Sequence, residues 1–444
     1  MILPSQAKPL LDLLAPCFTR HTFSRFTTLI VGAVLTTGRR TVANVLRTLG
    51  GLAAGHRTTY QRVFSSARWS GLQLGCALTR FVLERLVPSG PVALVGDDTV
   101  DGHPGRKVYG KCRHRDAVRS SHSYTAWRYG HKWVVLAVLV RFPFATRPWA
   151  LPLLVDLYRT PELDAAEGRR HRTPADLMTR MLRLLLLRFP RRTFVFVGDA
   201  GYGTHEVARF CRRHASRMTL VSKLHPDANL FAPPPPYRGH GRPRVKGERL
   251  PKPREAAANA RRIRCTVPWY GGGTRKVETA TATGHWYKAG HGLVPLRWVF
   301  VHDRGGTHRD EYLFTTDIRL SATAVIAAYC GRWNIETTFQ ECRSLVGLET
   351  TCGWSRKTVL RAAPCLFGLY TVVAVLFDML PQRKRSGGVQ WPGKSGVTFS
   401  DALTSVRRWI WEDGIFRQGH ADTAIKELPR PVRNLLLAAL APTP

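Results

Sequence analysis

Residues 321–348 read SATAVIAAYCGRWNIETTFQECRSLVGL, and they place one carboxylate among three groups that can contact phosphate. The apolar periodicity of this stretch predicts a helix. Along it, the side chains of Tyr329, Arg332, Glu336 and Arg343 are separated by three, four and seven residues. At about 100° per residue, these four side chains fall within roughly a 60° arc of a single helix. We therefore expect a helix face that presents an acid surrounded by phosphate-binding groups.

The composition indicates a folded protein with a polyanionic partner. Of the 444 residues, 67 are Lys or Arg and only 30 are Asp or Glu, so the formal net charge is +37. Such an excess repels itself unless a polyanion offsets it, and nucleic acid is the usual one. Arginine outnumbers lysine, which suits bidentate recognition of phosphate. Basic residues are spread along the whole chain, which disfavours a membrane surface as the partner.

The cysteines and the apolar runs favour a cytoplasmic, nucleoid-associated protein. The nine cysteines include no Cys-x-x-Cys pair, which disfavours a disulfide scaffold and a zinc knuckle. The N-terminus lacks the basic region and apolar core of a signal sequence. The longest uncharged run, Ala362–Phe377, is short for a membrane span and contains Pro364. We expect that run to be a buried helix and the protein to have no membrane partner.

The first two regions of the chain are expected to be helical and then α/β. Residues 1–88 carry apolar residues at three-and-four spacing and are expected to form a helical DNA-binding domain. Within them, two short helices could form a helix-turn-helix that presents arginines to DNA, namely Arg40, Arg57 and Arg62. Residues 89–225 alternate short apolar strands with helical segments, which is the order of an α/β sheet.

The remaining three regions are a β-rich insertion, a second part of the core and a tail. Residues 226–319 begin with a Pro- and Arg-rich loop and continue as short alternating strands. In that loop Arg242 and Arg244 are either a DNA-binding arm or part of a solvated linker. Residues 320–380 hold the opening stretch and the buried helix, and residues 381–444 are expected to be a linker and a helical tail.

Few acids are available for catalysis in so basic a chain. Asp97 and Asp98 follow the apolar strand pattern LVG, and Asp199 follows FVG. We expect these acids at the C-terminal ends of strands, where open α/β sheets collect ligands. Any one of them could instead cap a turn. Together with Glu336 they favour a site for hard divalent cations, which oxygen ligands bind in phosphoryl transfer.

Three motifs resemble those of DDE transposases with an RNase H-like core, in particular the insertion-sequence-4-like group. The motifs are GDDTV at 96–100, GDAGYG at 198–203 and YCGRWNIETTFQECR at 329–343. The last is similar to the family signature Tyr-(2)-Arg-(3)-Glu-(6)-Lys, except that Arg343 replaces the lysine. The resemblance covers about residues 90–350. It implies an α/β fold: a mixed-sheet RNase H-like core interrupted by a β-rich insertion, with helical N-terminal and C-terminal regions.

The resemblance also implies a reaction and its partners. Asp97, Asp199 and Glu336 would hold two Mg²⁺ or Mn²⁺ ions, with Asp98 as a possible substitute for Asp97. Water would cleave DNA at the transposon ends, and the freed 3′-hydroxyl would attack a phosphodiester, either forming a hairpin or joining target DNA. The partners would be double-stranded DNA with terminal inverted repeats and target DNA, bound by a dimer.

The resemblance assigns further side chains to DNA contacts. Arg332 and Arg343 would clamp phosphates, and Tyr329 would hydrogen-bond one near the cleavage site. In similar transposases the β-rich insertion contacts the transposon end. Trp286 and Trp298 are therefore candidates for stacking on a flipped base, although buried strand tryptophans are the stronger expectation.

Three other interpretations remain open from the sequence. An RNase H-like nuclease that cuts without strand transfer would carry the same acids. A non-catalytic DNA-binding protein descended from a transposase would have no need to keep all three. An RNA-binding role lacks support, because no aromatic-basic motif for single-stranded RNA is present.

Overall fold

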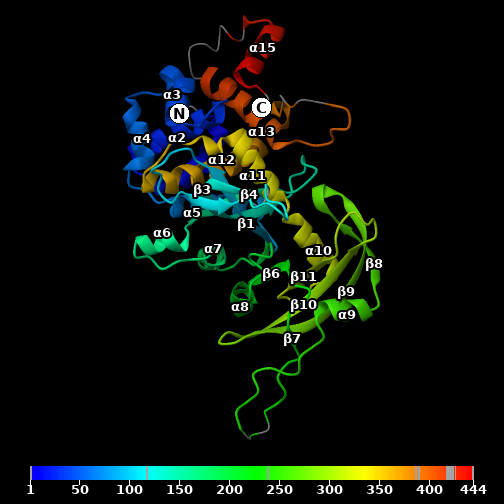
Figure 1. Cartoon of the computed structure of the whole chain (residues 1–444). Coiled ribbons are helices and arrows are strands. Elements are labelled where there is room, and N and C mark those ends of the chain that lie inside the picture. Colours follow the sequence, from blue (N-terminus) through cyan, green and yellow to red (C-terminus); the bar gives the residue numbers. More distant parts are fainter. Residues whose placement is uncertain are drawn as a thin grey trace.

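The computed structural model describes residues 3–116, 119–237, 239, 241–385, 388, 391–416, 425 and 427–442. It confirms a mixed α/β protein with a mixed sheet. Helices from both ends of the chain gather around one part of the sheet, and the strands β7 to β11 lie to one side of that part (Figure 1).

The region before the first strand is helical, as its apolar spacing predicts. Three of these helices begin at an N-cap residue whose side chain accepts a hydrogen bond from a backbone N–H of the first turn. These residues are Thr19, Thr41 and Ser70. The helices are α1 (Lys8–Leu14), α2 (Arg20–Leu35), α3 (Val42–Leu49), α4 (Arg57–Ser65) and α5 (Gly71–Leu86). Their DNA-binding role stays a prediction.

The three arginines expected to face DNA from the helix pair α3–α4 differ in their surroundings. Arg40 is partly buried: its guanidinium donates to the Leu345 carbonyl at 2.7 Å, and its backbone N–H donates to Thr350 Oγ1 at 2.8 Å. Burial lowers its pKa to about 10. The side chain of Arg40 therefore links the start of α3 to the segment after Glu336, and its contact with DNA stays a prediction. Arg57 and Arg62 are exposed and remain available.

The strands form one continuous sheet in the described part of the chain. In sheet order the main path is β2-β3-β1-β5-β6-β11-β10-β9-β7, with β4 beside β3 and β8 beside β9. The strands are β1 (Val92–Gly102), β2 (Cys112–Arg115), β3 (Trp127–Val140), β4 (Trp149–Tyr158), β5 (Phe194–Gly198), β6 (Met218–Lys223), β7 (Leu230–Phe231), β8 (Ile263–Pro268), β9 (Thr274–Lys288), β10 (Gly292–Asp303) and β11 (Glu311–Thr315).

The sheet is mixed, because the direction of pairing changes from antiparallel to parallel and back along it. Strand β3 pairs antiparallel with both β1 and β4, whereas β1, β5 and β6 run parallel. Strand β11 then pairs antiparallel with β6, so the strands after residue 226 extend the same sheet. The predicted β-rich region is therefore joined to the earlier strands through β6 and β11. The domain boundaries themselves stay a prediction.

Helices cover the earlier strands and place the candidate site between layers. The helices that follow β4 are α6 (Pro161–Ala166), α7 (Pro174–Arg188), α8 (His205–Arg213), α9 (Pro253–Asn259), α10 (Ala322–Gly331), α11 (Asn334–Glu341), α12 (Arg356–Met379), α13 (Phe399–Trp409) and α15 (Arg430–Leu440). Helix α7 packs against β3 and β4, while α5, α11 and α12 also pack on β4. Helix α13 lies against α2 and α12, with Phe399, Leu403 and Trp409 buried.

Helix α12 is the apolar segment expected to be buried. Among the described residues it alone is long and apolar enough to cross a membrane by length and composition, and 67% of its most apolar window is buried inside the protein. It includes Pro364, and the Thr371 hydroxyl donates to the Pro152 carbonyl of β4 at 2.7 Å. A core helix passes the same test of length and composition, so the packing on β4 supports the expectation of a buried helix.

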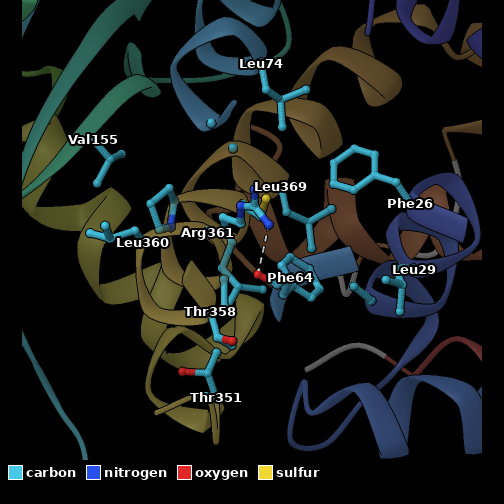
Figure 2. A pocket seen from close by; sticks show the side chains of 18 of the residues that line it. Phe26, Leu29, Phe64, Leu74, Val155, Thr351, Thr358, Leu360, Arg361 and Leu369 are labelled. Carbon is cyan, nitrogen blue, oxygen red and sulfur yellow. Dashed lines mark hydrogen bonds between the residues drawn. The ribbon is translucent and has the colours of Figure 1, made fainter. Parts of the chain in front are cut away.

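A cavity of about 950 Å³ lies between the N-terminal helices, β4 and α12. Figure 2 shows its apolar lining, which includes Phe26, Leu29, Leu74 and Leu369. The candidate acids described below do not line it. Residues of α2 to α5, β4 and α12 line it, and Arg361 is among them.

Arg361 of α12 fastens the end of α4. Its guanidinium donates to the carbonyls of Phe64 at 3.1 Å, Ala67 at 2.9 Å and Trp69 at 2.8 Å (the first bond is drawn in Figure 2). Its Cζ lies 4.5 Å from the centre of the Trp69 ring. Phe64 lies in the last turn of α4 and the other two residues follow it, at a helix end that leaves carbonyls without helical partners. Arg361 therefore stabilises the junction between the N-terminal helices and α12.

We expect Arg361→Ala to lower the free energy of unfolding by about 2–4 kcal/mol, because several buried acceptors lose a charged donor at once. Urea denaturation followed by circular dichroism measures this. The matched control is Lys357→Ala, an exposed residue on the same helix, which should change the value by less than about 0.5 kcal/mol. Equal effects of the two substitutions would contradict the fastening role.

Candidate active site

The parallel pairing of β1 with β5 brings two of the predicted acids together. The register aligns Gly96 with Gly198, so Asp97 and Asp199 occupy the next positions on neighbouring strands, which lie about 4.8 Å apart. Asp199 follows the last residue of β5, as expected. The expectation that Asp97 ends its strand is wrong, because β3 continues to pair with β1 as far as Gly102.

Asp97 and Asp98 have different partners because neighbouring residues of a strand point to opposite faces. Asp97 accepts a hydrogen bond from the Arg332 guanidinium and one from the backbone N–H of Asp98 at 2.8 Å. Asp98 lies 3.0 Å from the Lys132 ammonium and accepts from the Tyr202 hydroxyl at 3.5 Å. Of these two acids, it is therefore Asp97 that bonds a residue of the stretch 321–348.

Burial changes the protonation of both acids. It raises the pKa of Asp97 to about 7, opposed by Arg332 and reinforced by the negative charges of Asp199 and Asp98. Burial also raises the pKa of Asp98, with Lys132 acting in the opposite direction. Carboxylates that raise each other's pKa lie in one electrostatic neighbourhood, which is what a cation site needs.

The stretch 321–348 is not one helix, which corrects the expectation from its periodicity. It consists of α10, α11 and a π-helical turn at Cys342–Val346. At the junction, Asn334 Nδ2 donates to the Gly331 carbonyl at 2.9 Å, and backbone N–H groups bond three residues back instead of four. A side chain that competes for a helical carbonyl, next to a glycine, breaks the regular ladder.

Arg332, at this junction, links Asp97 to Glu336. One terminal nitrogen of its guanidinium donates to Asp97, and the other donates to Glu336 Oε1 at 3.0 Å. Its Nε is buried and has no hydrogen-bond partner within the described part of the chain. The structure therefore places an acid of β1 and the acid of α11 on two sides of one cation.

Tyr329 and Arg343 lie near this ion pair in different environments. Tyr329 is only 3% exposed, and its ring lies between the Lys223 ammonium at 5.7 Å and the Arg332 guanidinium at 5.8 Å. Burial raises its pKa above its usual range. Arg343 donates to the Thr99 hydroxyl of β1 and lies 3.4 Å from Glu349. A phosphate contact of either residue stays a prediction.

The other predicted DNA contacts lie away from the acids. Arg242 and Arg244 are exposed in the loop between β7 and α9, which projects from the β-rich side of the protein (Figure 1). Trp298 is 4% exposed, and Trp286 packs its ring on Phe314 at 5.8 Å. The interpretation of these tryptophans as buried strand residues is therefore confirmed for Trp298 and supported for Trp286.

Comparison with protein families identifies the chain. A family model described as DDE superfamily endonuclease matches residues 13–277. The chain belongs to the DDE superfamily endonucleases. The match includes Asp97 and Asp199 of this DDE endonuclease and ends before Glu336, so the third acid rests on the geometry around Arg332.

Two further comparisons complete the picture. A solved structure titled "Cryo-EM structure of piggyBac transposase synaptic complex with hairpin DNA" is similar over 96% of this chain and 77% of that chain, with a TM-score of 0.41 and 11% identity. A search of curated proteins found no match.

Endonucleases of this superfamily generally use divalent metal ions. The side chains of the candidate acids are of the type that binds such an ion. Asp97, Asp199 and Glu336 supply the hard carboxylate oxygens that Mg²⁺ and Mn²⁺ prefer. Among the described residues, no three His, Cys, Asp or Glu side chains lie close enough together to hold a metal ion. Asp97 and Glu336 are instead each paired with the Arg332 guanidinium.

The sequence reasoning missed two lysines that the fold of this DDE endonuclease brings to Asp98 and to Tyr329. Lys132 of β3 pairs with Asp98, and Lys223 pairs with Glu311 at 2.7 Å beside Tyr329. Lys223 ends β6 as the neighbouring Asp199 follows β5. That shared position at adjacent parallel strand ends was the signal that could have identified it.

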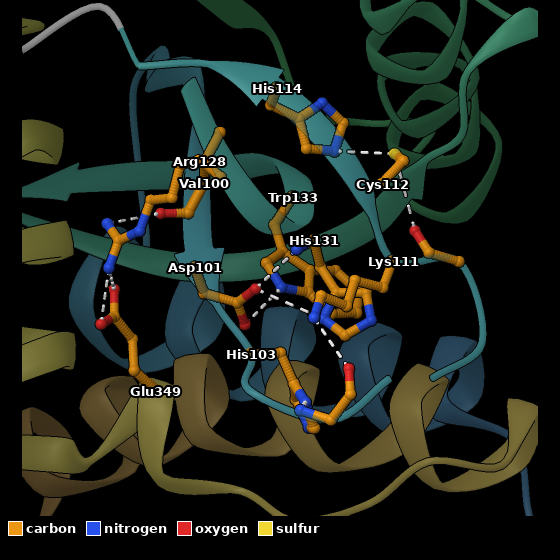
Figure 3. A network of polar contacts seen from close by, with 12 residues as sticks. Val100, Asp101, His103, Lys111, Cys112, His114, Arg128, His131, Trp133 and Glu349 are labelled. Carbon is orange, nitrogen blue, oxygen red and sulfur yellow. Dashed lines mark hydrogen bonds and ion pairs between the residues drawn. The ribbon is translucent and has the colours of Figure 1, made fainter. Parts of the chain in front are cut away.

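A third acid of β1 is structural. Asp101 is buried and accepts from the backbone N–H of His131 at 3.0 Å and from Trp133 Nε1 at 3.0 Å (Figure 3). The Nδ1 atom of His131 lies 3.3 Å from Asp101 Oδ1, and its Nε2 atom contacts the Tyr109 carbonyl at 3.0 Å. Because Asp101 is buried and both of its carboxylate oxygens have partners on β3, it fixes β1 against β3 and is not a candidate for the cation site.

Proposed function

We propose that this DDE endonuclease is a cut-and-paste DNA transposase of the insertion-sequence-4-like group. The observation that carries the proposal is the arrangement of the acids: Asp97 and Asp199 occupy neighbouring positions on two parallel strands, and Arg332 forms ion pairs with both Asp97 and Glu336. The resemblance of residues 329–343 to the Tyr-Arg-Glu-Lys signature, with Arg343 in place of lysine, supports the transposase rather than another endonuclease.

The strand order supports an RNase H-like core with a β-rich insertion. Three antiparallel strands, β4, β3 and β1, continue into two parallel strands, β5 and β6. Strands β7 to β11 come between β6 and the helix of Glu336 in the sequence. In this proposal the insertion and its loop arginines, Arg242 and Arg244, contact the transposon end, and the net charge of +37 supports DNA as the substrate.

The chain's own side chains would divide the work of phosphoryl transfer. Asp97, Asp199 and Glu336 would hold two Mg²⁺ or Mn²⁺ ions, which when bound polarise the phosphate and activate the attacking oxygen. Arg332 would exchange its carboxylate partners for the substrate phosphate and use its unpartnered Nε as a further donor. Lys132 neutralises Asp98, so that residue stays outside the ion-binding set.

The proposed reaction has two steps, hydrolysis and strand transfer. Water attacks the phosphorus at the transposon end, and the departing 3′-oxygen takes a proton to become a 3′-hydroxyl. That hydroxyl then attacks a phosphodiester of the opposite strand or of target DNA, and a second 3′-oxygen leaves. Because two ends must be cut together, we propose a dimer on DNA, acting in the cytoplasm on nucleoid DNA.

A strand-transfer assay tests the function. The donor is a labelled duplex that carries the inverted repeat found in the DNA flanking the gene, and the target is supercoiled plasmid in Mg²⁺. The transposase proposal expects labelled donor covalently joined to plasmid. Cleavage without joining would favour an RNase H-like nuclease, and binding without either would favour a non-catalytic DNA-binding protein.

The raised pKa of Asp97 predicts the pH dependence of metal binding. A carboxyl group with a pKa of about 7 is protonated below that pH and must lose its proton to bind a cation. The apparent Kd for Mn²⁺ should therefore rise about tenfold for each pH unit below about 7 and level off above it. Titration calorimetry with the protein and Mn²⁺ alone measures this.

Two variants make the pH test specific. Asp97→Asn should bind Mn²⁺ more weakly and without this pH dependence, whereas Asp98→Asn should keep the pH dependence with its midpoint shifted to lower pH, because the charge of Asp98 helps to raise the pKa of Asp97. A flat profile between pH 5.5 and 8 in the wild type, or loss of the profile only in Asp98→Asn, would overturn the assignment of Asp97.

A further inference from the structure

The ribbon formed by β2 and the start of β3 has two different faces. Its register pairs Arg113 with Tyr129 and Arg115 with Trp127, and all four of these side chains are exposed. Since side chains opposite each other in a pair share a face, the four form one surface. We call Arg113, Arg115, Trp127 and Tyr129 the ribbon surface.

The other face of the ribbon is fixed to the protein, as Figure 3 shows. His114 is buried with its Nε2 3.0 Å from Cys112 Sγ, and Arg128 donates to both carboxylate oxygens of Glu349 at 2.8 Å. Arg128 also donates to the Val100 carbonyl at 3.3 Å. These contacts prevent the ribbon from turning over, so the ribbon surface is held outward.

The ribbon surface exposes aromatic rings where a soluble protein usually buries them. Trp127 is 50% and Tyr129 61% exposed, and the Arg113 guanidinium lies 4.2 Å from the centre of the Trp127 ring. An arginine stacked on a tryptophan adds positive charge to a flat apolar platform. Rings of this kind are sequence-tolerant partners for bases, because every base has a π-face.

We propose that the ribbon surface binds an unpaired segment of DNA by stacking its bases on Trp127 and Tyr129 while Arg113 and Arg115 contact its phosphates. The inference deepens the proposed function, since it rests on DNA being the substrate. Duplex DNA presents base edges and phosphates but hides its base faces, so two exposed rings fit an unpaired strand. The net charge of +37 matches a polyanion better than a second, equally basic copy of the chain.

The position of the ribbon suits DNA that has been opened near the acids. Along β3, Tyr129 lies six residues before Val135, and Val135 pairs with Asp97. Six residues of strand span about 20 Å. The ribbon surface therefore lies about 20 Å from Asp97 along the strand, which is within reach of a short unpaired segment.

Fluorescence anisotropy of the full-length protein tests the proposal in EDTA, where no cleavage occurs. The probes are a fluorescein-labelled single-stranded 20-mer, a duplex of the same length, and the single strand with abasic sites. Trp127→Ala and Tyr129→Ala should each raise the Kd for the single strand about tenfold, and change the Kd for the duplex less than twofold. Trp127→Phe should retain most of the affinity.

The matched control is Trp391→Ala, which removes another exposed tryptophan, 52% exposed and in the segment before α13. It should leave single-strand binding unchanged. On the abasic strand, the wild type and Trp127→Ala should bind equally, because no bases remain to stack.

Three outcomes would overturn the proposal. Trp127→Ala could bind the single strand as well as wild type, or it could lose equal affinity for the abasic strand. Sedimentation velocity could instead show that the substitution disrupts a dimer, which would make the surface an interface between two copies. Single-strand binding by Asp199→Asn separates this proposal from the proposed function, since that variant should bind normally even though it cannot cleave.

Discussion

Glu336→Gln is expected to lower the rate of DNA cleavage in Mg²⁺ by about 10³-fold or more. The substitution keeps the size of the side chain and its hydrogen bond to Arg332, but it removes one of the three negative charges proposed to hold the ions. The Glu336 side chain is 36% exposed at the start of α11, so we expect little change in thermal stability. Single-turnover cleavage of labelled end DNA measures the rate.

Two other carboxylates sharpen this test. Asp199→Asn should cause a loss of the same order, because Asp199 occupies the position next to Asp97. Asp98→Asn should reduce cleavage far less, because Asp98 faces Lys132 and Tyr202. Wild-type cleavage by Glu336→Gln would remove it from the site, and a larger loss in Asp98→Asn than in Asp97→Asn would reverse their assignment.

Arg332→Gln is expected to change cleavage and metal binding in opposite directions. Cleavage should fall about 10²–10³-fold, because the substrate phosphate loses a bidentate cationic partner. At a pH well above the pKa of Asp97, Mn²⁺ should bind several-fold more tightly, because Asp97 and Glu336 lose the guanidinium that neutralises them. Calorimetry with Mn²⁺ alone and cleavage of end DNA provide the two readouts.

Arg343→Gln is the matched control for this pair of effects. Its guanidinium contacts Thr99 and Glu349 and no member of the proposed ion-binding set. We expect weaker DNA binding or cleavage with an unchanged Kd for Mn²⁺. If Arg332→Gln bound Mn²⁺ as weakly as wild type or more weakly, Arg332 would not compete with the ions for the carboxylates.

Local sequence patterns predicted the elements that carry the acids. An apolar run followed by Gly-Asp placed Asp199 directly after β5, because a buried parallel strand and its turn are both local features. The sequence also predicted α/β order and helices in the first 88 residues. These elements depend on residue spacing alone, so they are readable without knowledge of the partners.

Features set by distant partners were not predictable. The extension of β1 beyond Asp97 depends on the long antiparallel partner β3, and the continuous sheet depends on β11 meeting β6. The break between α10 and α11 depends on one side-chain bond from Asn334 to the Gly331 carbonyl. The guanidinium of Arg40 donates to the carbonyl of Leu345, a residue far away in the sequence.

The central claim is that Asp97, Asp199 and Glu336 together hold the catalytic ions. The most direct measurement is iron-mediated cleavage of the polypeptide: Fe²⁺ replaces Mg²⁺, hydroxyl radicals form at the bound ion, and mass spectrometry locates the breaks in the chain. Breaks close to residues 97, 199 and 336, suppressed by excess Mg²⁺ and lost in Asp199→Asn, are the predicted result. Breaks confined to other segments, or unchanged in Asp199→Asn, would contradict the claim.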